Sequence, residues 1–149
     1  SFASASAVAA SVSNLKSRYV KYLETLCAAN GIDINALKAE GALIDRIEMF
    51  FGGLPELIGL KYFERLRVLQ IFGQDIACMK PLVEVSETLA ELWVCEGVLK
   101  ELTGIETCKH LKRLYLYQNE IQDASPLSCL HELSLLHIQN NQIANLDVL

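Results

Sequence analysis

"LKRLYLYQNEI", residues 111–121, decides the fold of this chain. Leu114 and Leu116 are two residues apart, which places both side chains on one face of an extended strand. Asn119 follows three residues after Leu116, and its amide offers donors and an acceptor to neighbouring backbone groups. The stretch therefore predicts a short strand with one buried face that ends in a bend held by an asparagine.

The same pattern recurs five times along the chain at intervals of 22 or 23 residues, which is typical of a repeat architecture. The units start near residues 44, 66, 89, 111 and 133. Asn119 and Asn141 occupy the asparagine position of the last two units, but the first three units hold Gly52, Gln74 and Gly97 there. These departures count against a continuous asparagine ladder, and against a regular curvature, in the N-terminal half.

The second half of each unit is regular too. Apolar residues recur five, eight and eleven positions after the asparagine position, as Leu57, Leu60 and Phe63 do in the first unit. A spacing of three suits a turn of 3₁₀ helix that returns along the far side. We therefore predict that residues 44–149 form five repeats, the last one truncated at Leu146 and Leu149, with about five parallel strands on a concave face and short helices on the convex face.

This pattern resembles the leucine-rich repeat family, in its 22-residue intracellular subclass typified by a regulatory subunit of protein phosphatase 1. The stretches LCAANGI, IEMFFGGLPELIGLKYF, ELWVCEG and LKRLYLYQNEI together also resemble the N-terminal part of a cilium-associated leucine-rich repeat-containing protein. The resemblance implies an α/β leucine-rich repeat solenoid. It also implies scaffolding or regulatory work, in a cilium or flagellum or on a phosphatase.

Residues 1–43 are predicted to form a helical cap over the first repeat, whose strand edge would otherwise be exposed. Apolar residues at helical spacing predict a helix over 12–29, with Ser13 or Asn14 as its N-cap and Gly31 just after its end. The Ala/Ser segment through residue 11 either extends this helix or frays. A second short helix is expected over residues 35–40.

No comparable cap follows Leu149, where the sequence stops inside the fifth unit. We expect one of two arrangements. Either the chain is a fragment of a longer protein, or its open C-terminal edge joins a second copy into a homodimer.

Composition excludes several classes of function. A formal charge of −5 without a dense Lys/Arg cluster counts against direct nucleic-acid binding, and no apolar run is long enough to span a membrane. Five scattered cysteines favour free thiols in a reducing, cytoplasmic compartment. No nucleophile or phosphate-loop motif is present, so we expect neither catalysis nor a cofactor.

The best metal candidate is a repeated Cys-x-His pattern, with Cys108 and His110 in one unit and Cys129 and His131 in the next. Stacking of the two units would bring two Cys and two His together, as in a tetrahedral zinc site. However, Cys108 falls on an inward position, where a thiol behaves as a small apolar residue, and Cys129 is one place out of register. A zinc-dependent module is therefore kept as an alternative to a protein-interaction module.

Strand alternation identifies a candidate protein-binding face. If Leu114 and Leu116 point inward, Arg113, Tyr115 and Tyr117 point outward. The same rule in every repeat gives three columns of outward residues along the sheet, the first through Arg113, the second through Tyr115 and the third through Tyr117. Trp, Tyr and Arg dominate the binding energy of interfaces. The candidate binding residues are Trp93, Tyr115, Tyr117, Phe72, Arg113, His137, Glu91 and Phe50.

A purely structural interpretation competes with this one. Aromatic neighbours on adjacent strands stabilise a sheet by themselves. In that interpretation Phe50 and Phe51 pack under the N-terminal cap. Strand alternation separately places Cys95 in the third outward column.

Overall fold

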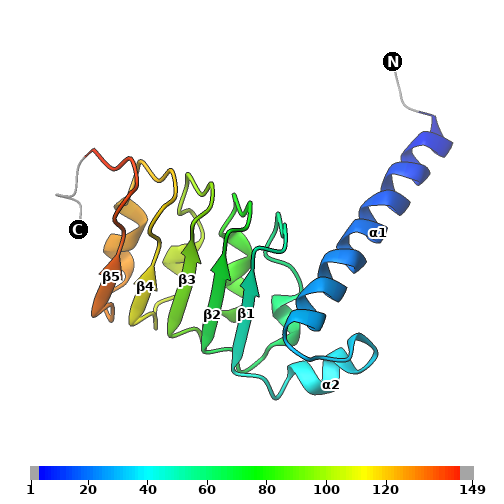
Figure 1. Cartoon of the computed structure of the whole chain (residues 1–149), viewed down its shortest axis with the longest axis horizontal. Helices are drawn as coiled ribbons and strands as arrows, with labels where there is room; N and C mark the ends of the chain where they lie inside the picture. The colour runs from blue at the N-terminus through cyan, green and yellow to red at the C-terminus, as the bar shows by residue number, and fades with distance from the viewer. Residues whose placement is uncertain (1–3, 145–149) are drawn as a thin grey trace.

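The computed structural model describes residues 4–144 and contains one parallel sheet of five strands in sequence order (Figure 1). The strands are β1 (Arg46–Phe50), β2 (Val68–Phe72), β3 (Glu91–Cys95), β4 (Arg113–Tyr115) and β5 (Leu135–His137). Their register pairs equivalent residues of successive repeats, so that Arg46 lies beside Val68 and Trp93 beside Tyr115. The predicted fold class and strand register are confirmed.

Short 3₁₀ helices connect the strands and cover one face of the sheet (Figure 1). They are η2 (Leu60–Tyr62), η3 (Lys80–Val85), η4 (Ile105–Thr107) and η5 (Ser125–Cys129). Parallel strands require such crossovers because each chain must return to the same end of the sheet. Within residues 4–144, no helix combines the length and the hydrophobicity that crossing a bilayer requires.

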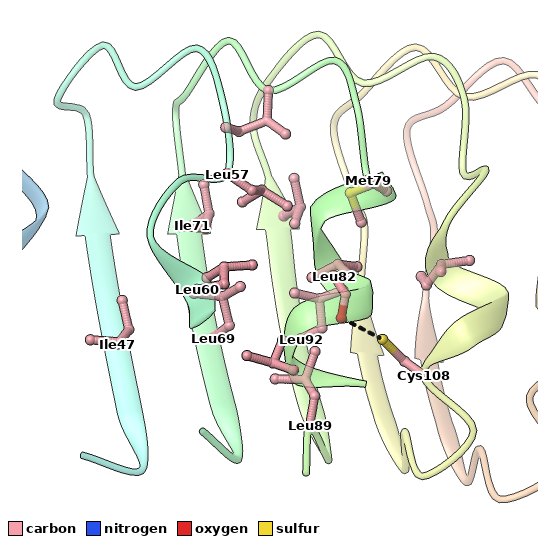
Figure 2. Packing of buried hydrophobic residues seen from close by; sticks show 14 of the residues in the cluster. Ile47, Leu57, Leu60, Leu69, Ile71, Met79, Leu82, Leu89, Leu92 and Cys108 are labelled. Atoms are coloured by element: carbon pink, nitrogen blue, oxygen red, sulfur yellow. Dashed lines mark hydrogen bonds between the residues drawn. The ribbon is translucent and has the colours of Figure 1, made fainter. Parts of the chain in front are cut away.

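The core lies between the sheet and the 3₁₀ helices. Inward residues of adjacent strands, such as Leu69 and Leu92, pack against Leu60 and Leu82 from the helices, and each of these is at most 1% exposed (Figure 2). Full burial of a side chain of this size contributes about 1.5–3 kcal/mol. In the fifth repeat the equivalent Leu136 is only partly buried, and the predicted truncation at Leu146 and Leu149 falls outside the described residues.

The asparagine positions join neighbouring repeats through the backbone. Asn119 is 6% exposed, and its Oδ1 accepts a hydrogen bond from the Leu99 N–H at 3.2 Å. Its Nδ2 donates to the carbonyls of Val94 at 2.7 Å and Leu116 at 3.0 Å. Asn141 makes the equivalent three bonds one repeat further on, at 2.9 to 3.0 Å. Each amide therefore bonds to its own strand end and to the repeat before it.

The first three repeats have no asparagine at this position, and their contacts there differ. Gln74 is 2% exposed, and its longer side chain accepts from the Leu54 N–H and donates to the Phe72 carbonyl at 3.1 Å. At Gly97 no side chain fits, because a Cβ would lie 2.6 Å from the Gln74 carbonyl oxygen and 3.2 Å from Asn119 Oδ1. The series of side-chain amides is therefore interrupted at Gly97. In the second repeat, Gln74 makes hydrogen bonds like those that asparagine makes in the last two repeats.

The N-terminal helix α1 (Ala5–Ala29) includes the Ala/Ser segment, which is one of the two alternatives that the sequence left open. Ser4 is its N-cap, with Oγ accepting a hydrogen bond from the Ala7 N–H at 3.2 Å, so the prediction of Ser13 or Asn14 as the cap was wrong. The Ala-rich segment extends the helix because alanine has the highest helix propensity and Ser4 satisfies a free N–H. Residues 1–3 lie outside the described residues.

The end of α1 is a Schellman motif centred on Gly31, which has φ +66°. The Ile32 N–H bonds the Cys27 carbonyl at 2.9 Å, and the Gly31 N–H bonds the Ala28 carbonyl at 3.4 Å. The helices η1 (Ile34–Ala36) and α2 (Leu37–Gly41) then lead into β1, where a short helix over residues 35–40 was predicted.

Asn30 connects this helix end to the edge of the sheet. Its Oδ1 accepts from the Glu48 N–H at 2.8 Å, and its Nδ2 donates to the carbonyls of Glu48 and Leu26, both at 2.8 Å. A single side-chain amide therefore pairs with both backbone groups of a β1 residue, as a neighbouring strand would. Leu23 packs beside Gly59 in the same region, where a Cβ on Gly59 would lie 2.6 Å from Leu23 Cδ1.

We predict that Asn119→Ala lowers the free energy of unfolding by about 1–3 kcal/mol, because it leaves buried backbone groups without partners. Urea denaturation measures the change. Gln122→Ala is the control, since this amide is exposed and bonds only the exposed Gln142 side chain, and its effect should stay within about 0.5 kcal/mol. Equal effects of the two substitutions would contradict the structural role of Asn119.

Asn30→Ala should free the edge strand at Glu48, and we expect the amide of Glu48 to exchange at least about tenfold faster with deuterium. Hydrogen exchange followed by NMR measures this single amide. Asn35→Ala is the matched control, because the Asn35 side chain bonds Asp33 in the exposed turn and does not contact the sheet. Unchanged protection of Glu48 in Asn30→Ala would show that α1 is held to β1 by other contacts.

Candidate functional site

The outer sheet face, the side of the sheet that points away from the 3₁₀ helices, carries a continuous stack of aromatic rings. We call it the aromatic ladder, and it consists of Phe50, Phe72, Trp93, Tyr115 and His137. One ring comes from each strand, so the ladder crosses the whole sheet. The repeat register places these side chains on neighbouring strands, about 4.8 Å apart.

The rings are close enough to be in direct contact. Phe50 and Phe72 stack with centroids 4.8 Å apart, and Trp93 and Tyr115 stack at 3.5 Å with an interplanar angle of 12°. Tyr115 and His137 stack at 5.1 Å. Tyr115 is therefore stacked on both faces and presents its edge to solvent, whereas Phe72 and Trp93 meet at a tilt.

The ladder changes column between β2 and β3. Phe50 and Phe72 belong to the third outward column, whereas Trp93, Tyr115 and His137 belong to the second. Phe72 and Trp93 bridge the change with centroids 5.6 Å apart and a tilt of 43°. The third column cannot continue as a ring stack at β3 because its next member is Cys95.

The prediction that Cys95 points outward into solvent was wrong. It is 1% exposed, and its Sγ donates a hydrogen bond to the Tyr115 carbonyl at 3.2 Å. Burial raises the pKa of the Cys95 thiol to about 12. Burial and the neighbouring Cys95 and Glu96 also raise the pKa of Tyr117. Because the Cys95 side chain is small, its larger neighbours cover it and exclude solvent from it.

The structure places all eight predicted binding residues on or beside the outer sheet face. Arg113 and Phe50 are exposed, and the other six are half-buried, namely Glu91, Trp93, Tyr115, Tyr117, His137 and Phe72. The indole N–H of Trp93 donates to Glu91 Oε1 at 2.7 Å, which holds the ring in its stacked orientation. Phe50 is 52% exposed and Phe51 is 70% exposed, so the expectation that they pack under the N-terminal cap was wrong.

Phe51 is a feature that strand alternation did not identify as part of the surface. It has φ +47° and directly precedes the asparagine position, where Gly73, Glu96, Gln118 and Asn140 also have positive φ. The Phe51 ring lies over Gly73, since a Cβ on Gly73 would meet the ring carbons Cδ1 and Cε1. A left-handed residue at this position turns every repeat, and in the first repeat it adds an exposed ring beside Phe50.

Positive charge surrounds one end of the outer sheet face. A hollow of about 300 Å³ lies at the start of β2–β4, and its lining includes Arg67, Lys112 and Arg113 together with Glu91. It is separate from a hollow of about 370 Å³ beside α1. None of these three cations forms an ion pair with a carboxylate inside the described range. These three cations are therefore available to pair with an acidic group of a partner beside the aromatic ladder.

The Cys-x-His pairs do not converge. Cys108 is buried, with Sγ 3.9 Å from the Leu82 carbonyl oxygen (Figure 2), and burial raises its pKa to about 11. His110 instead lies 3.5 Å from Glu132 on the surface. Among residues 4–144, no three His, Cys, Asp or Glu side chains are arranged to hold a metal ion.

The repeated strand, the 3₁₀ return and the amide ladder define the fold as a leucine-rich repeat solenoid. The family model described as leucine-rich repeats (2 copies) matches residues 109–149, which hold the last two repeats. Solenoids of this kind use their extended concave surface for binding, so the fold is that of a protein-interaction module.

Curated relatives share sequence over a larger part of the chain. Leucine-rich repeat-containing protein 56 of Homo sapiens is 31% identical over 85 residues, and the Mus musculus protein is 38% identical over 85 residues, each match covering 57% of this chain. The Rattus norvegicus protein is 33% identical over 96 residues, or 62% of this chain. These matches span only 15–16% of the length of the relatives.

Solved structures show the same fold at low sequence identity. An internalin (inlF) of Listeria monocytogenes has a TM-score of 0.61 at 20% identity, over 78% of this chain and 34% of that one. An internalin C2 (inlC2) of the same organism has a TM-score of 0.56 at 21% identity, over 84% and 66%. A chain of the Drosophila melanogaster SNF/U2A′ complex has a TM-score of 0.54 at 14% identity, over 69% and 63%.

The geometry of the cysteines predicts their order of alkylation. At pH 8 a thiol with a pKa of about 12 is only about one part in ten thousand thiolate, so buried Cys95 should react far more slowly than exposed Cys78. Iodoacetamide labelling followed by peptide mass spectrometry measures each site. Labelling in concentrated urea is the control, because all five cysteines should then react. Equal native rates at Cys95 and Cys78 would contradict the burial of Cys95.

Proposed function

We propose that this chain is a non-catalytic scaffolding or regulatory module that binds a partner protein on its outer sheet face through the aromatic ladder. The five-ring stack carries the proposal, because large aromatic surfaces on a solvent-facing sheet are typical of interface centres. In this proposal residues 44–149 supply the binding face, and residues 1–43 cap the first repeat and hold it in register.

The geometry of the ladder also constrains the partner chemistry. Both faces of Tyr115 are already stacked, so no cation can bind over its ring. The exposed ring edges carry partial positive charge and suit carbonyl oxygens, carboxylates and aliphatic groups. Together with Lys112 and Arg113 at the start of β4, this favours a partner segment with apolar side chains and an acidic flank.

The cellular setting of the proposal is a cilium or flagellum. Its support is the likeness of stretches such as ELWVCEG to a cilium-associated leucine-rich repeat protein. Regulation of a phosphatase is the alternative within the same class, supported by the 22-residue repeat length. A homodimer joined at the C-terminal edge stays a prediction, because residues 145–149 lie outside the described part of the chain.

The experiment is affinity capture from an extract of isolated cilia with the wild-type chain and the double variant Trp93→Ala/Tyr115→Ala. Removal of two central rings should reduce capture of the specific partner at least about tenfold. Quantitative mass spectrometry measures the enrichment relative to an extract of the cell bodies. Capture of a phosphatase catalytic subunit would support the regulatory alternative.

Two control variants separate binding from folding. Trp93→Phe/Tyr115→Phe keeps stacked rings and should retain the partner. Val83→Ala removes an exposed apolar side chain, 57% exposed on η3 at the opposite face, and should also retain it. If the alanine pair folds normally by circular dichroism and still captures every partner, the aromatic ladder serves the sheet alone.

A further inference from the structure

Most of α1 extends beyond the solenoid. The buried residues of this 25-residue helix are Leu23, Leu26 and Cys27, all in its last two turns. Upstream, the exposed fractions are 51% for Val8, 45% for Val12 and 60% for Leu15. Figure 1 shows the corresponding part of α1 projecting away from the sheet and the 3₁₀ helices. A cap over β1 needs only the last turns, so the projecting part is available for another role.

The projecting part carries a coiled-coil seam. Apolar residues follow one another at intervals of 4, 3, 4, 3 and 4 residues, in the order Val8, Val12, Leu15, Tyr19, Tyr22 and Leu26. This alternation is the heptad spacing by which two helices pack along each other. The C-terminal part of the seam packs on the solenoid through Leu26, with Tyr22 partly buried against the core. The solenoid therefore covers the part of the seam that follows Tyr19, whereas the part before Tyr19 is exposed.

The flanks of the uncovered seam are basic or small. Lys16, Arg18 and Lys21 are the only charged residues of α1 before Glu24, although the whole chain has a formal charge of −5. With Val12 and Tyr19 at one heptad position, Lys16 and Arg18 occupy the two positions that border a partner helix. Nearer the N-terminus, the bordering residues are Ala9 and Ser11, which allow close approach.

A hollow at the base of the projecting part gives this seam a defined end. Its volume is about 370 Å³, and it lies between α1 and the segment after β1. Leu15, Tyr19 and Ile58 form apolar walls, and Lys16 and Arg18 lie on the α1 side. Glu56, in the segment after β1, adds one acidic side chain to the lining. A helix laid along α1 would therefore insert its end between α1 and the solenoid, which sets its position along the seam.

We propose that the projecting part of α1 docks an amphipathic helix of a partner protein whose apolar seam is flanked by acidic residues. The heptad spacing specifies a helix as the occupant, and Lys16 and Arg18 specify its charge. A second copy of this chain would bring the same basic flanks to one interface, where like charges oppose association. A membrane surface needs a wider apolar face than this narrow seam, which Ala and Ser border.

The test uses the full chain and two synthetic helical peptides of about four heptads with leucine at both seam positions. One peptide has glutamate and the other lysine at the flanking positions, and fluorescence anisotropy measures both dissociation constants. We expect the acidic peptide to bind at least about tenfold more tightly than the basic one. Lys16→Glu/Arg18→Glu should reverse this preference, because the repulsion then falls on the acidic peptide.

A matched pair of variants locates the contact on the helix. Leu15→Gln, on the seam, should weaken binding of the acidic peptide at least about tenfold. Val20→Gln, off the seam and 47% exposed, should leave the dissociation constant within about twofold. Both side chains are exposed and neither belongs to the core, so neither substitution should unfold the solenoid, and circular dichroism verifies this.

Several results would overturn the proposal. These are no detectable binding of the acidic peptide, equal binding of both peptides, or equal effects of Leu15→Gln and Val20→Gln. Sedimentation velocity that shows a dimer dissolved by Leu15→Gln would assign the seam to a second copy. Cosedimentation with phosphatidylserine vesicles that Leu15→Gln abolishes would assign it to a membrane. None of these measurements involves Trp93 or Tyr115, so they are independent of the proposed function of the outer sheet face.

Discussion

The buried amide of Asn119 is the interaction on which the regularity of this protein depends. Its oxygen accepts from the Leu99 N–H, and its nitrogen donates to the Val94 and Leu116 carbonyls. A side chain that bonds two successive repeats at once fixes both their spacing and their register. Because a slip by one residue would turn every strand side chain to the opposite face, this constraint also keeps Leu114 inside and Tyr115 outside.

The aromatic ladder is a consequence of that register. Rings from five different repeats can stack only if equivalent residues lie side by side on adjacent strands, as Trp93 and Tyr115 do at 3.5 Å. Stacking in turn stabilises the outer sheet face and orients the rings with their edges outward. The sheet therefore offers a rigid surface, whereas α1 offers a separate surface on a projecting helix that Asn30 holds to β1.

Much of the fold followed from local patterns. The spacing of two in Leu114 and Leu116 predicted a strand, and its recurrence every 22 or 23 residues predicted the parallel register that the structure shows. Each repeat contacts mainly its neighbours, so a local rule applied five times predicts the global arrangement. The predicted cap of α1 was wrong because Ser13 and Asn14 are good caps in isolation. The alternative in which the Ala/Ser segment extends the helix is the one that alanine propensity and Ser4 favour.

The candidate sites were predicted less completely. Alternation identified which residues point outward, but it treated Cys95 like its neighbours, because depth depends on the size of the side chains that surround a position. Likewise, the apolar spacing of α1 was visible from Leu15 onward, yet the same spacing fits a buried cap and a free docking seam. Whether Val8 and Val12 are covered depends on the direction in which α1 leaves the sheet.

The sequence by itself determined the repeat, the inward and outward residues of each strand, and the 3₁₀ returns, because these depend on spacings within about 22 residues. Only the tertiary structure decided that Phe72 and Trp93 join two columns into one ladder, that the Gln74 side chain makes hydrogen bonds like those of the asparagines, and that α1 projects with its seam uncovered. These features depend on contacts between distant segments, whose distances and angles no local pattern contains.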